Sequence, residues 1–249
     1  MRHIFASKQH KGMADEKKYS YKYPHPAITA DNVVFGFDGR DLHILLIERG
    51  LEPYKGSWAL PGGFMRIDET VEQCAIRELA EETGVTNIYL EQFHVFSAVE
   101  RDPRERVVTV AFYALVRKAG YRLIAGDDAA RANWFKIGML PPLAFDHDKI
   151  IDMARQRLRE RLRTKPIAFK LLDEKFSMSE LQQLYEAING VTYDRRNFQR
   201  KMFSTGLLED RGPSPEPQHN RIPELYSFNE EEYVRKQSED KLRRNPFDF

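Results

Sequence analysis

Three glutamates spaced three and four residues apart are the residues of this 249-residue sequence best suited to chemistry. On a helix, Glu78, Glu81 and Glu82 present their carboxylates on one face. Such carboxylates repel one another unless a cation lies between them, and hard oxygen atoms are the ligands that Mg²⁺ or Mn²⁺ prefers. A metal held there could bind diphosphate oxygens, orient a water molecule and lower its pKa. The spacing predicts a divalent metal site; the competing interpretation is an acidic helix face that contacts only solvent.

Neighbouring residues are suited to support this site. Arg77 can form a two-pronged bond with Glu69, because a guanidinium and a carboxylate match in shape. Gly62 and Gly63 permit a backbone turn close to the metal, so we assign Gly63 to the metal site together with the three glutamates. The predicted catalytic residues are Glu69, Arg77, Glu78, Glu81 and Glu82.

One helix must position these side chains. Val71, Ala75 and Leu79 are four residues apart, which indicates a helix with one apolar face. Asp68 is its predicted N-cap, and Gly84 its predicted end.

Strands are expected on both sides of that helix. Apolar, β-branched runs lie at residues 28–37, 42–47, 58–60, 89–99, 107–116 and 132–137. Residues 38–41 read Asp-Gly-Arg-Asp, which predicts a hairpin between the first two runs. Mixed strands around one early helix predict an α/β sandwich over residues 23–145.

The glutamate segment carries a family resemblance. Gly63, five residues, Glu69, seven residues, and then residues 77–85 (Arg-Glu-Leu-Ala-Glu-Glu-Thr-Gly-Val) match every fixed position of the Nudix box. On these residues the first half of the chain resembles the MutT-like Nudix hydrolases. The resemblance implies an α/β/α sandwich with a mixed sheet, and magnesium-dependent cleavage of a nucleoside diphosphate linked to another moiety. It also implies that the three glutamates are metal ligands or an auxiliary base, and that Arg77 and Glu69 orient the helix.

A second domain is predicted after this one. An apolar stripe with basic residues in its last turns predicts a linker helix over residues 146–165, ending before Pro166. Ser177 and Glu180 then have capping-box spacing. Two helices joined by a short turn, followed by two strand-like segments and a loop between them, predict a winged helix-turn-helix domain over residues 166–229.

The second of these two helices is the predicted DNA-reading element. It begins at Asp194, and Phe198, Met202 and Phe203 are expected to face the core. Its other side chains suit phosphates and purine edges in the major groove. The competing interpretation is an ordinary solvated helix face. The predicted DNA-binding residues are Arg195, Arg196, Asn197, Gln199, Arg200 and Lys201, with Arg221 from the wing.

The formal net charge of +1 conceals a division along the chain. Residues 23–145 carry 13 Lys and Arg against 17 Asp and Glu, whereas residues 146–205 carry 13 against 9. The basic excess predicts an anionic partner for the second domain. Arginines within 155–165 could contact phosphates or merely solvate the linker helix. Residues 1–22 are predicted to be a mobile basic tail, and residues 230–249 a loosely attached tail.

Cysteine usage and hydropathy indicate the compartment. The single cysteine, Cys74, cannot form an internal disulfide and is expected in the core, which fits a reducing cytosol. The sequence has no run of about 18 apolar residues. We therefore expect a cytoplasmic protein without a membrane segment.

The domain order resembles that of the Nudix-related transcriptional regulators, which sense ADP-ribose or arabinose. Further matching stretches are residues 101–106 and 140–147. Arg101, Arg104 and Arg106 are expected to grip a phosphate or ribose, with an exposed charged turn as the alternative. His147 could be a ligand or switch residue, and a histidine satisfied by its neighbours is the favoured alternative.

Two functions follow from these observations. The first is a dimeric regulator that binds operator DNA and an ADP-ribose-like nucleotide or a pentose sugar, and that retains magnesium-dependent pyrophosphohydrolase activity if its intact box is functional. The second is a metabolic ADP-ribose pyrophosphatase whose C-terminal domain serves dimerisation or substrate selection. In both, ADP-ribose is the first substrate to test.

Overall fold

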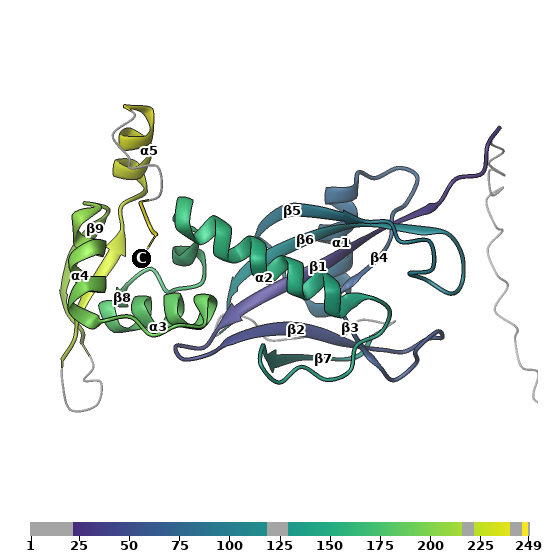
Figure 1. Ribbon diagram of the computed structural model, residues 1–249, viewed down its shortest axis with the longest axis horizontal. Helices are drawn as coiled ribbons and strands as arrows, with labels where there is room; N and C mark the ends of the chain where they lie inside the picture. Colours follow the sequence, from purple (N-terminus) through teal and green to yellow (C-terminus); the bar gives the residue numbers. More distant parts are fainter. Residues whose placement is uncertain (1–21, 119–128, 216–221, 240–245, 249) are drawn as a thin grey trace, which may run out of the picture.

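The computed structural model describes residues 22–118, 129–215, 222–239 and 246–248 (Figure 1). An α/β unit with a large sheet is followed by a smaller unit of helices and a three-stranded sheet. The predicted N-terminal tail lies outside the described residues except for Lys22. No helix in these described ranges is long and apolar enough to cross a membrane.

Within the described residues, seven strands form the large sheet. Their order is β3-β2-β1-β6-β5, with β4 added beside β1 and β7 beside β2. β1 and β6 are parallel, and the other pairs are antiparallel, so the sheet is mixed as predicted. The strands are β1 (Ala27–Phe37), β2 (Leu42–Arg49), β3 (Trp58–Ala59), β4 (Gly62–Phe64), β5 (Tyr89–Phe96), β6 (Val107–Arg117) and β7 (Ala129–Lys136).

The predicted hairpin between β1 and β2 is confirmed. The two strands pair antiparallel. The Asp38 carboxylate accepts hydrogen bonds from the backbone amides of Arg40 and Asp41 at 3.0 and 2.8 Å. This is the local pairing by which aspartate favours turns.

Helices cover both faces of the sheet, which confirms the α/β/α sandwich. Alternate residues along each strand point to opposite faces. Val34 and Leu45 pack in a cluster with Leu79 of α1 (Val71–Thr83). Phe35 and Ile44 lie in the core with Ile150 of α2 (His147–Thr164).

The start of α1 differs from the prediction. Thr70, and not Asp68, is the N-cap: its hydroxyl accepts from the Gln73 amide, and the Gln73 side chain accepts from the Thr70 amide. This reciprocal pair satisfies two amides that a helix start leaves without partners. Gly84 ends the helix in a left-handed conformation, as predicted.

The predicted linker helix is also a layer of the sandwich. α2 buries Ile150, Ala154, Leu158 and Leu162 in the same core cluster as the sheet. Figure 1 shows it crossing one face of the sheet and ending beside the smaller unit. α2 therefore contributes to both units.

The smaller unit has winged-helix topology. The helices α3 and α4 are followed by the hairpin of β9 and β10, and the small sheet has the order β8-β10-β9. The elements after α2 are a short 3₁₀ helix (Ile167–Lys170), β8 (Phe176–Ser177), α3 (Met178–Asn189), α4 (Arg195–Ser204), β9 (Leu208–Pro213), β10 (Glu224–Phe228) and α5 (Glu230–Ser238).

The predicted starts of α3 and α4 are confirmed, with one error inside α4. Ser177 and Glu180 form the capping box, and the Asp194 carboxylate accepts from the Asn197 amide. Phe198 and Met202, four residues apart, are buried. Phe203 is 42% exposed, because the next position along the helix turns away from that face.

The predicted loose C-terminal tail is wrong for its described residues. Residues 230–238 form α5, with Asn229 as N-cap. Phe247 is 1% exposed and lies in the core cluster, edge-on to Phe169. The Asp248 carboxylate accepts a hydrogen bond from Arg163 of α2 at 2.8 Å. Two phenylalanines, at 247 and 249, after a polar segment form no periodic pattern that would reveal such docking.

Candidate functional site

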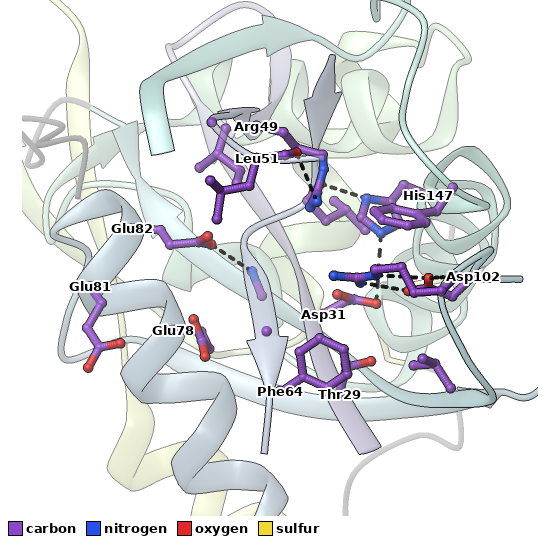
Figure 2. A pocket seen from close by; sticks show the side chains of 18 of the residues that line it. Thr29, Asp31, Arg49, Leu51, Phe64, Glu78, Glu81, Glu82, Asp102 and His147 are labelled. Atoms are coloured by element: carbon purple, nitrogen blue, oxygen red, sulfur yellow. Dashed lines mark hydrogen bonds and ion pairs between the residues drawn. The ribbon is translucent and has the colours of Figure 1, made fainter. Parts of the chain in front are cut away.

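A pocket of about 400 Å³ opens over one end of the large sheet (Figure 2). Its lining comes from β1, β2, β4, α1, the loop after β5 and the start of α2. Figure 2 shows the predicted glutamates on one side of it, His147 and Asp102 on the other, and Arg49 and Phe64 between them.

Arg77 ties the loop before α1 to the helix itself. Its Nε and Nη2 donate to the two oxygens of Glu69 at 2.9 and 2.6 Å, so the predicted two-pronged pair is confirmed. Its Nη1 donates to Glu78 at 2.6 Å, and Nη2 also reaches the Phe64 carbonyl at 3.2 Å. The bond from Arg77 lowers the pKa of Glu69 to about 2. Glu69 therefore remains ionised.

The three glutamates occupy different environments. Glu82 accepts from the Gly62 amide at 2.8 Å, and burial, followed by repulsion from Glu78 and Asp31, raises its pKa to about 8. Burial also raises the pKa of Glu78. The side chain of Glu81 is 52% exposed and bonds Arg77 at 3.0 Å, and Figure 2 shows it turned away from Glu82.

The carboxylates of the three glutamates are chemically suited to bind a divalent cation, but they do not lie close enough together to hold one. Within the part of the chain that the structure describes, no group of three or more His, Cys, Asp or Glu side chains is close enough to hold a metal ion. Burial nevertheless raises the pKa values of Glu78 and Glu82, because it removes solvent that would otherwise balance their negative charge. A divalent cation would balance it, and carboxylate oxygens are suitable ligands.

Two glycines let the sheet approach the helix. A Cβ on Gly62 would lie 2.2 Å from the Ala30 carbonyl oxygen, and one on Gly63 would lie 2.5 Å from the Glu78 carboxylate. The predicted turn at these glycines is wrong, since both belong to β4 and pair with β1. They are required for close packing of β4 against its neighbours.

A buried polar network that the sequence did not predict forms the floor of the pocket. Asp31 accepts from the Thr109 hydroxyl at 2.7 Å, and Thr29 donates to Thr109 at 2.6 Å. Arg101 Nη2 lies 3.5 Å from Asp31 and donates to Asp146 at 2.8 Å. Asp31 is 6% exposed and Arg101 8%. Arg101 therefore does not lie on an exposed charged turn.

The other two predicted ligand-binding arginines separate. Arg104 lines the pocket, with two hydrogen bonds to Asp102 at 3.0 and 2.7 Å. Arg106 lies outside the lining and donates to backbone carbonyls, including those of Ser97 and Ala98. The structure thus brings Arg101 and Arg104 to the pocket, and not Arg106.

Aromatic rings lie beside the pocket arginines. The Arg104 guanidinium is 5.1 Å from the ring centre of Phe64 and 5.6 Å from that of Phe145. Arg49, which the sequence did not indicate, is 4.9 Å from the Phe145 ring. Burial, followed by repulsion from Arg104, lowers the pKa of Arg49. This wall combines cationic and aromatic groups, which suits an anionic ligand with a flat ring.

His147 is buried at the edge of the pocket. Its Nδ1 accepts from the Leu60 amide at 2.9 Å, which places the proton of the neutral ring on Nε2, 4.0 Å from Asp31. Burial lowers its pKa, so the neutral form is favoured. A neighbour thus satisfies Nδ1, as the favoured alternative predicted, while the ring also lines the pocket, so its role as a ligand residue stays a prediction.

The predicted DNA-reading face lies on the outer side of α4. Arg195, Arg196, Asn197 and Arg200 are exposed, and Gln199 and Lys201 are partly buried. Arg200 donates to Asn197 at 3.0 Å. Arg221 lies outside the described residues.

The arginines of α2 are bonded within the chain. Arg157 pairs with Glu160 at 2.8 Å, Arg161 with Glu91 at 2.6 Å, and Arg163 with Asp248 at 2.8 Å. Arg159 donates to the Ile188 carbonyl of α3 at 2.9 Å. These contacts favour a role of the arginines in attaching α2 to the rest of the fold, and not a role in binding phosphates.

Comparisons with known proteins agree with this architecture. The NUDIX domain model matches residues 25–154, and the NrtR DNA-binding winged helix domain model matches residues 168–228. The chain therefore belongs to the Nudix family. Its second domain is a winged helix of the NrtR type, which confirms the predicted fold class and domain order.

Particular relatives share both halves or the first half alone. The chain is 34% identical to the "ADPR responsive transcriptional repressor NtrR" of Acinetobacter baylyi over 85% of each chain. It is 44% identical to the "ADP-ribose pyrophosphatase" of Methanocaldococcus jannaschii over 55% of this chain and 77% of that protein.

Solved structures of Shewanella oneidensis NrtR extend the likeness to the fold. The complex of NrtR with a 27mer DNA superposes with a TM-score of 0.68 at 32% identity, covering 81% of this chain and 93% of the other. The NUDIX domain of the same protein with ADP ribose gives 0.52 at 36% identity, covering 56% and 94%.

Proposed function

We propose that this chain is a cytoplasmic transcription regulator that binds ADP-ribose in the pocket of its Nudix domain and operator DNA through α4. The observation that carries the proposal is that one chain holds both a pocket lined by carboxylate, guanidinium and aromatic groups and an exposed Arg and Asn face on a winged helix. The names of the Acinetobacter and Shewanella relatives support this choice of ligand and partner.

In the pocket, each wall has a distinct role. Arg49 and Arg104 supply donors for a diphosphate, and the rings of Phe64 and Phe145 offer flat surfaces. His147 offers its Nε2 proton from a neutral ring. Arg106 is not among the proposed ligand contacts, because its guanidinium donates to backbone carbonyls outside the pocket.

Mg²⁺ or Mn²⁺ belongs to the same proposal. Glu78 and Glu82 would hold it, joined by Glu81 if that side chain leaves Arg77 and turns inward. The bound cation would neutralise diphosphate charge and lower the pKa of a water molecule. Arg77 and Glu69 hold the helix in register with the loop before it. Hydrolysis of ADP-ribose is thereby a retained activity of the regulator.

For DNA, the proposed contacts are the six α4 residues and Arg221. A homodimer would present two copies of α4 to half-sites about one helical turn apart. Arginine and asparagine at the start of a recognition helix suit guanine and adenine edges.

A DNA-binding measurement tests the regulator. Fluorescence anisotropy with the DNA fragment upstream of the chain's own gene should show salt-sensitive, sequence-selective binding that ADP-ribose alters. Arg196→Ala with Arg200→Ala should weaken binding at least tenfold. Arg157→Ala, on α2, is the control and should bind as the wild type. Equal binding to unrelated DNA by all three proteins would contradict the proposal.

A metabolic ADP-ribose pyrophosphatase is the second candidate. The complete glutamate pattern and the 44% identity to the Methanocaldococcus enzyme favour it. It predicts Mg²⁺-dependent release of AMP and ribose 5-phosphate, lost in Glu82→Gln, together with no selective DNA binding. The combination of hydrolysis and selective DNA binding would support the regulator that retains activity.

A further inference from the structure

Helix α2 extends from the pocket to the winged helix. Phe145 and His147, at its start, line the pocket, and Arg159, near its other end, contacts α3. The 18-residue helix is about 27 Å long. Figure 1 shows its last turns lying next to the winged-helix unit.

At the pocket end, the first turn is held by groups that a ligand would engage. Phe145 has φ 54°, a left-handed conformation that is unfavourable for a bulky residue. Its ring lies against the guanidiniums of Arg49 and Arg104. The next residue, Asp146, accepts two hydrogen bonds from buried Arg101 at 2.8 and 3.3 Å. An anion that drew Arg49 and Arg104 toward itself would weaken their contacts with the Phe145 ring.

At the far end, the contact reaches the helix that precedes α4. The Arg159 Nε donates to the carbonyl of Ile188, in the last turn of α3, where a cation also favours the helix dipole. Gly190 then ends α3, and the turn leads to Asp194, the N-cap of α4. Arg159 is therefore placed to fix the α3–α4 turn.

Apolar packing joins the same region to the large sheet. Leu158 of α2, Ile188 of α3 and Leu42 of β2 line one small cavity. On the same turn of α2, Arg161 bonds Glu91 of β5 at 2.6 Å. This turn thus lies between the sheet and α3, and a shift of α2 changes both contacts.

We propose that ligand binding in the pocket changes the position of the DNA-reading helix α4, and that α2 transmits this change, with Arg159 as the positioning residue for α3 and α4. The inference rests on the proposed function, because it names how ligand and DNA binding are coupled. Coupling requires that the ligand favour one of two arrangements of α2. The contacts of the Phe145 ring with Arg49 and Arg104 would differ between these two arrangements.

Two neighbouring arginines provide a matched experiment. Arg159→Met keeps the apolar stem and removes the donor, whereas Arg157→Met removes only a pair within α2. Calorimetry measures ADP-ribose binding, and anisotropy measures binding to the upstream fragment with and without ADP-ribose. In Arg159→Met we expect ligand affinity within about twofold of the wild type, and the ligand effect on DNA affinity reduced about threefold or more. Arg157→Met and Arg159→Lys, which retains a donor, should keep the wild-type effect.

Amide hydrogen exchange gives a second measurement that needs no DNA. ADP-ribose should change exchange in residues 186–194 of the wild type, and this change should shrink in Arg159→Met. A full wild-type response in Arg159→Met, by both measurements, would overturn the proposal. So would a wild type that binds ADP-ribose without any change at residues 186–194 or in DNA affinity. Failure of the wild type to bind ADP-ribose in calorimetry would instead overturn the proposed function on which the inference rests.

Discussion

Burial distinguishes Glu82 from Glu81 on α1. Its carboxylate faces the pocket and carries a pKa of about 8, whereas Glu81 lies half in solvent beside Arg77. The folded protein thus holds a proton on Glu82 across a pH range in which the unfolded chain, with an ordinary pKa near 4.5, has released it. This residue should therefore dominate the pH response of the empty pocket.

The direction in which stability changes with pH can be measured. Because the folded pKa is raised, the stabilising contribution is complete below about pH 4.5 and is lost as the pH rises to about 8. In metal-free buffer, the unfolding free energy of the wild type should fall by up to about 1.4 kcal/mol per pH unit as the pH rises through this window. Glu82→Gln should lack this fall. Chemical denaturation at several pH values checks this, with Glu81→Gln as the control. Parallel pH profiles for the wild type and Glu82→Gln would contradict the assignment.

Individual residues also show what sequence could reveal. Glu69, Arg77 and the three glutamates were predictable because their spacing is local to one helix and its entry loop. Asp31 and Arg49 were not, because no motif or spacing distinguishes them from the polar residues beside them, Asn32 and Glu48, and only the folded sheet brings them to the same pocket as the glutamates. The sequence likewise could not decide between Thr70 and Asp68 as the N-cap, because both residue types can adopt the backbone angles of an N-cap.

At the scale of elements, the close approach of β4 and α1 shapes the pocket. A side chain at Gly63 would overlap the Glu78 carboxylate, so this glycine sets the distance between the strand and the helix. The bonds from Arg77 to Glu69 and to the Phe64 carbonyl fix the same junction from the other side. The glutamate helix is therefore positioned by its neighbours as well as by its own caps.

Enlarging Gly63 tests this close packing. Gly63→Ala should lower the free energy of unfolding by about 1–3 kcal/mol and weaken ADP-ribose binding, because the added methyl group displaces Glu78. Gly138→Ala is the matched control: nothing lies within 4 Å of its added Cβ, and its effect should stay within about 0.5 kcal/mol. Thermal or chemical denaturation measures both. Equal stability of the two variants would show that β4 can shift to accommodate the added methyl group without a loss of unfolding free energy.

Across the whole molecule, one apolar core serves both domains. The same cluster contains Phe35 of the large sheet, Leu158 of α2, Phe198 of α4 and Phe247 near the C-terminus. Sequence periodicity located the helices and strands of each domain, but it did not show that their cores join. That continuity involves α2, which packs in both directions, α3, which lies against β2, and Phe247, which is distant in the sequence.

Truncating this phenylalanine tests the shared core. Phe247→Ala should cost about 3 kcal/mol of unfolding free energy, since the side chain is fully buried. Val234→Ala, at a 57% exposed position of α5, should change it by less than about 0.5 kcal/mol. Calorimetry should show one unfolding transition for the wild type. Two separated transitions in the wild type, or no loss in Phe247→Ala, would contradict a shared core.

The shared use of α2 also limits how such a regulator can be recombined. A chimera that joins this Nudix domain to a foreign DNA-binding module must cut near residues 164–166, where α2 ends. The foreign module must then cover Leu158 and Leu162 and offer a carbonyl to Arg159. Modules would therefore exchange most readily among proteins that already end their Nudix domain in such a helix, so sensor and DNA reader would be inherited as a matched pair.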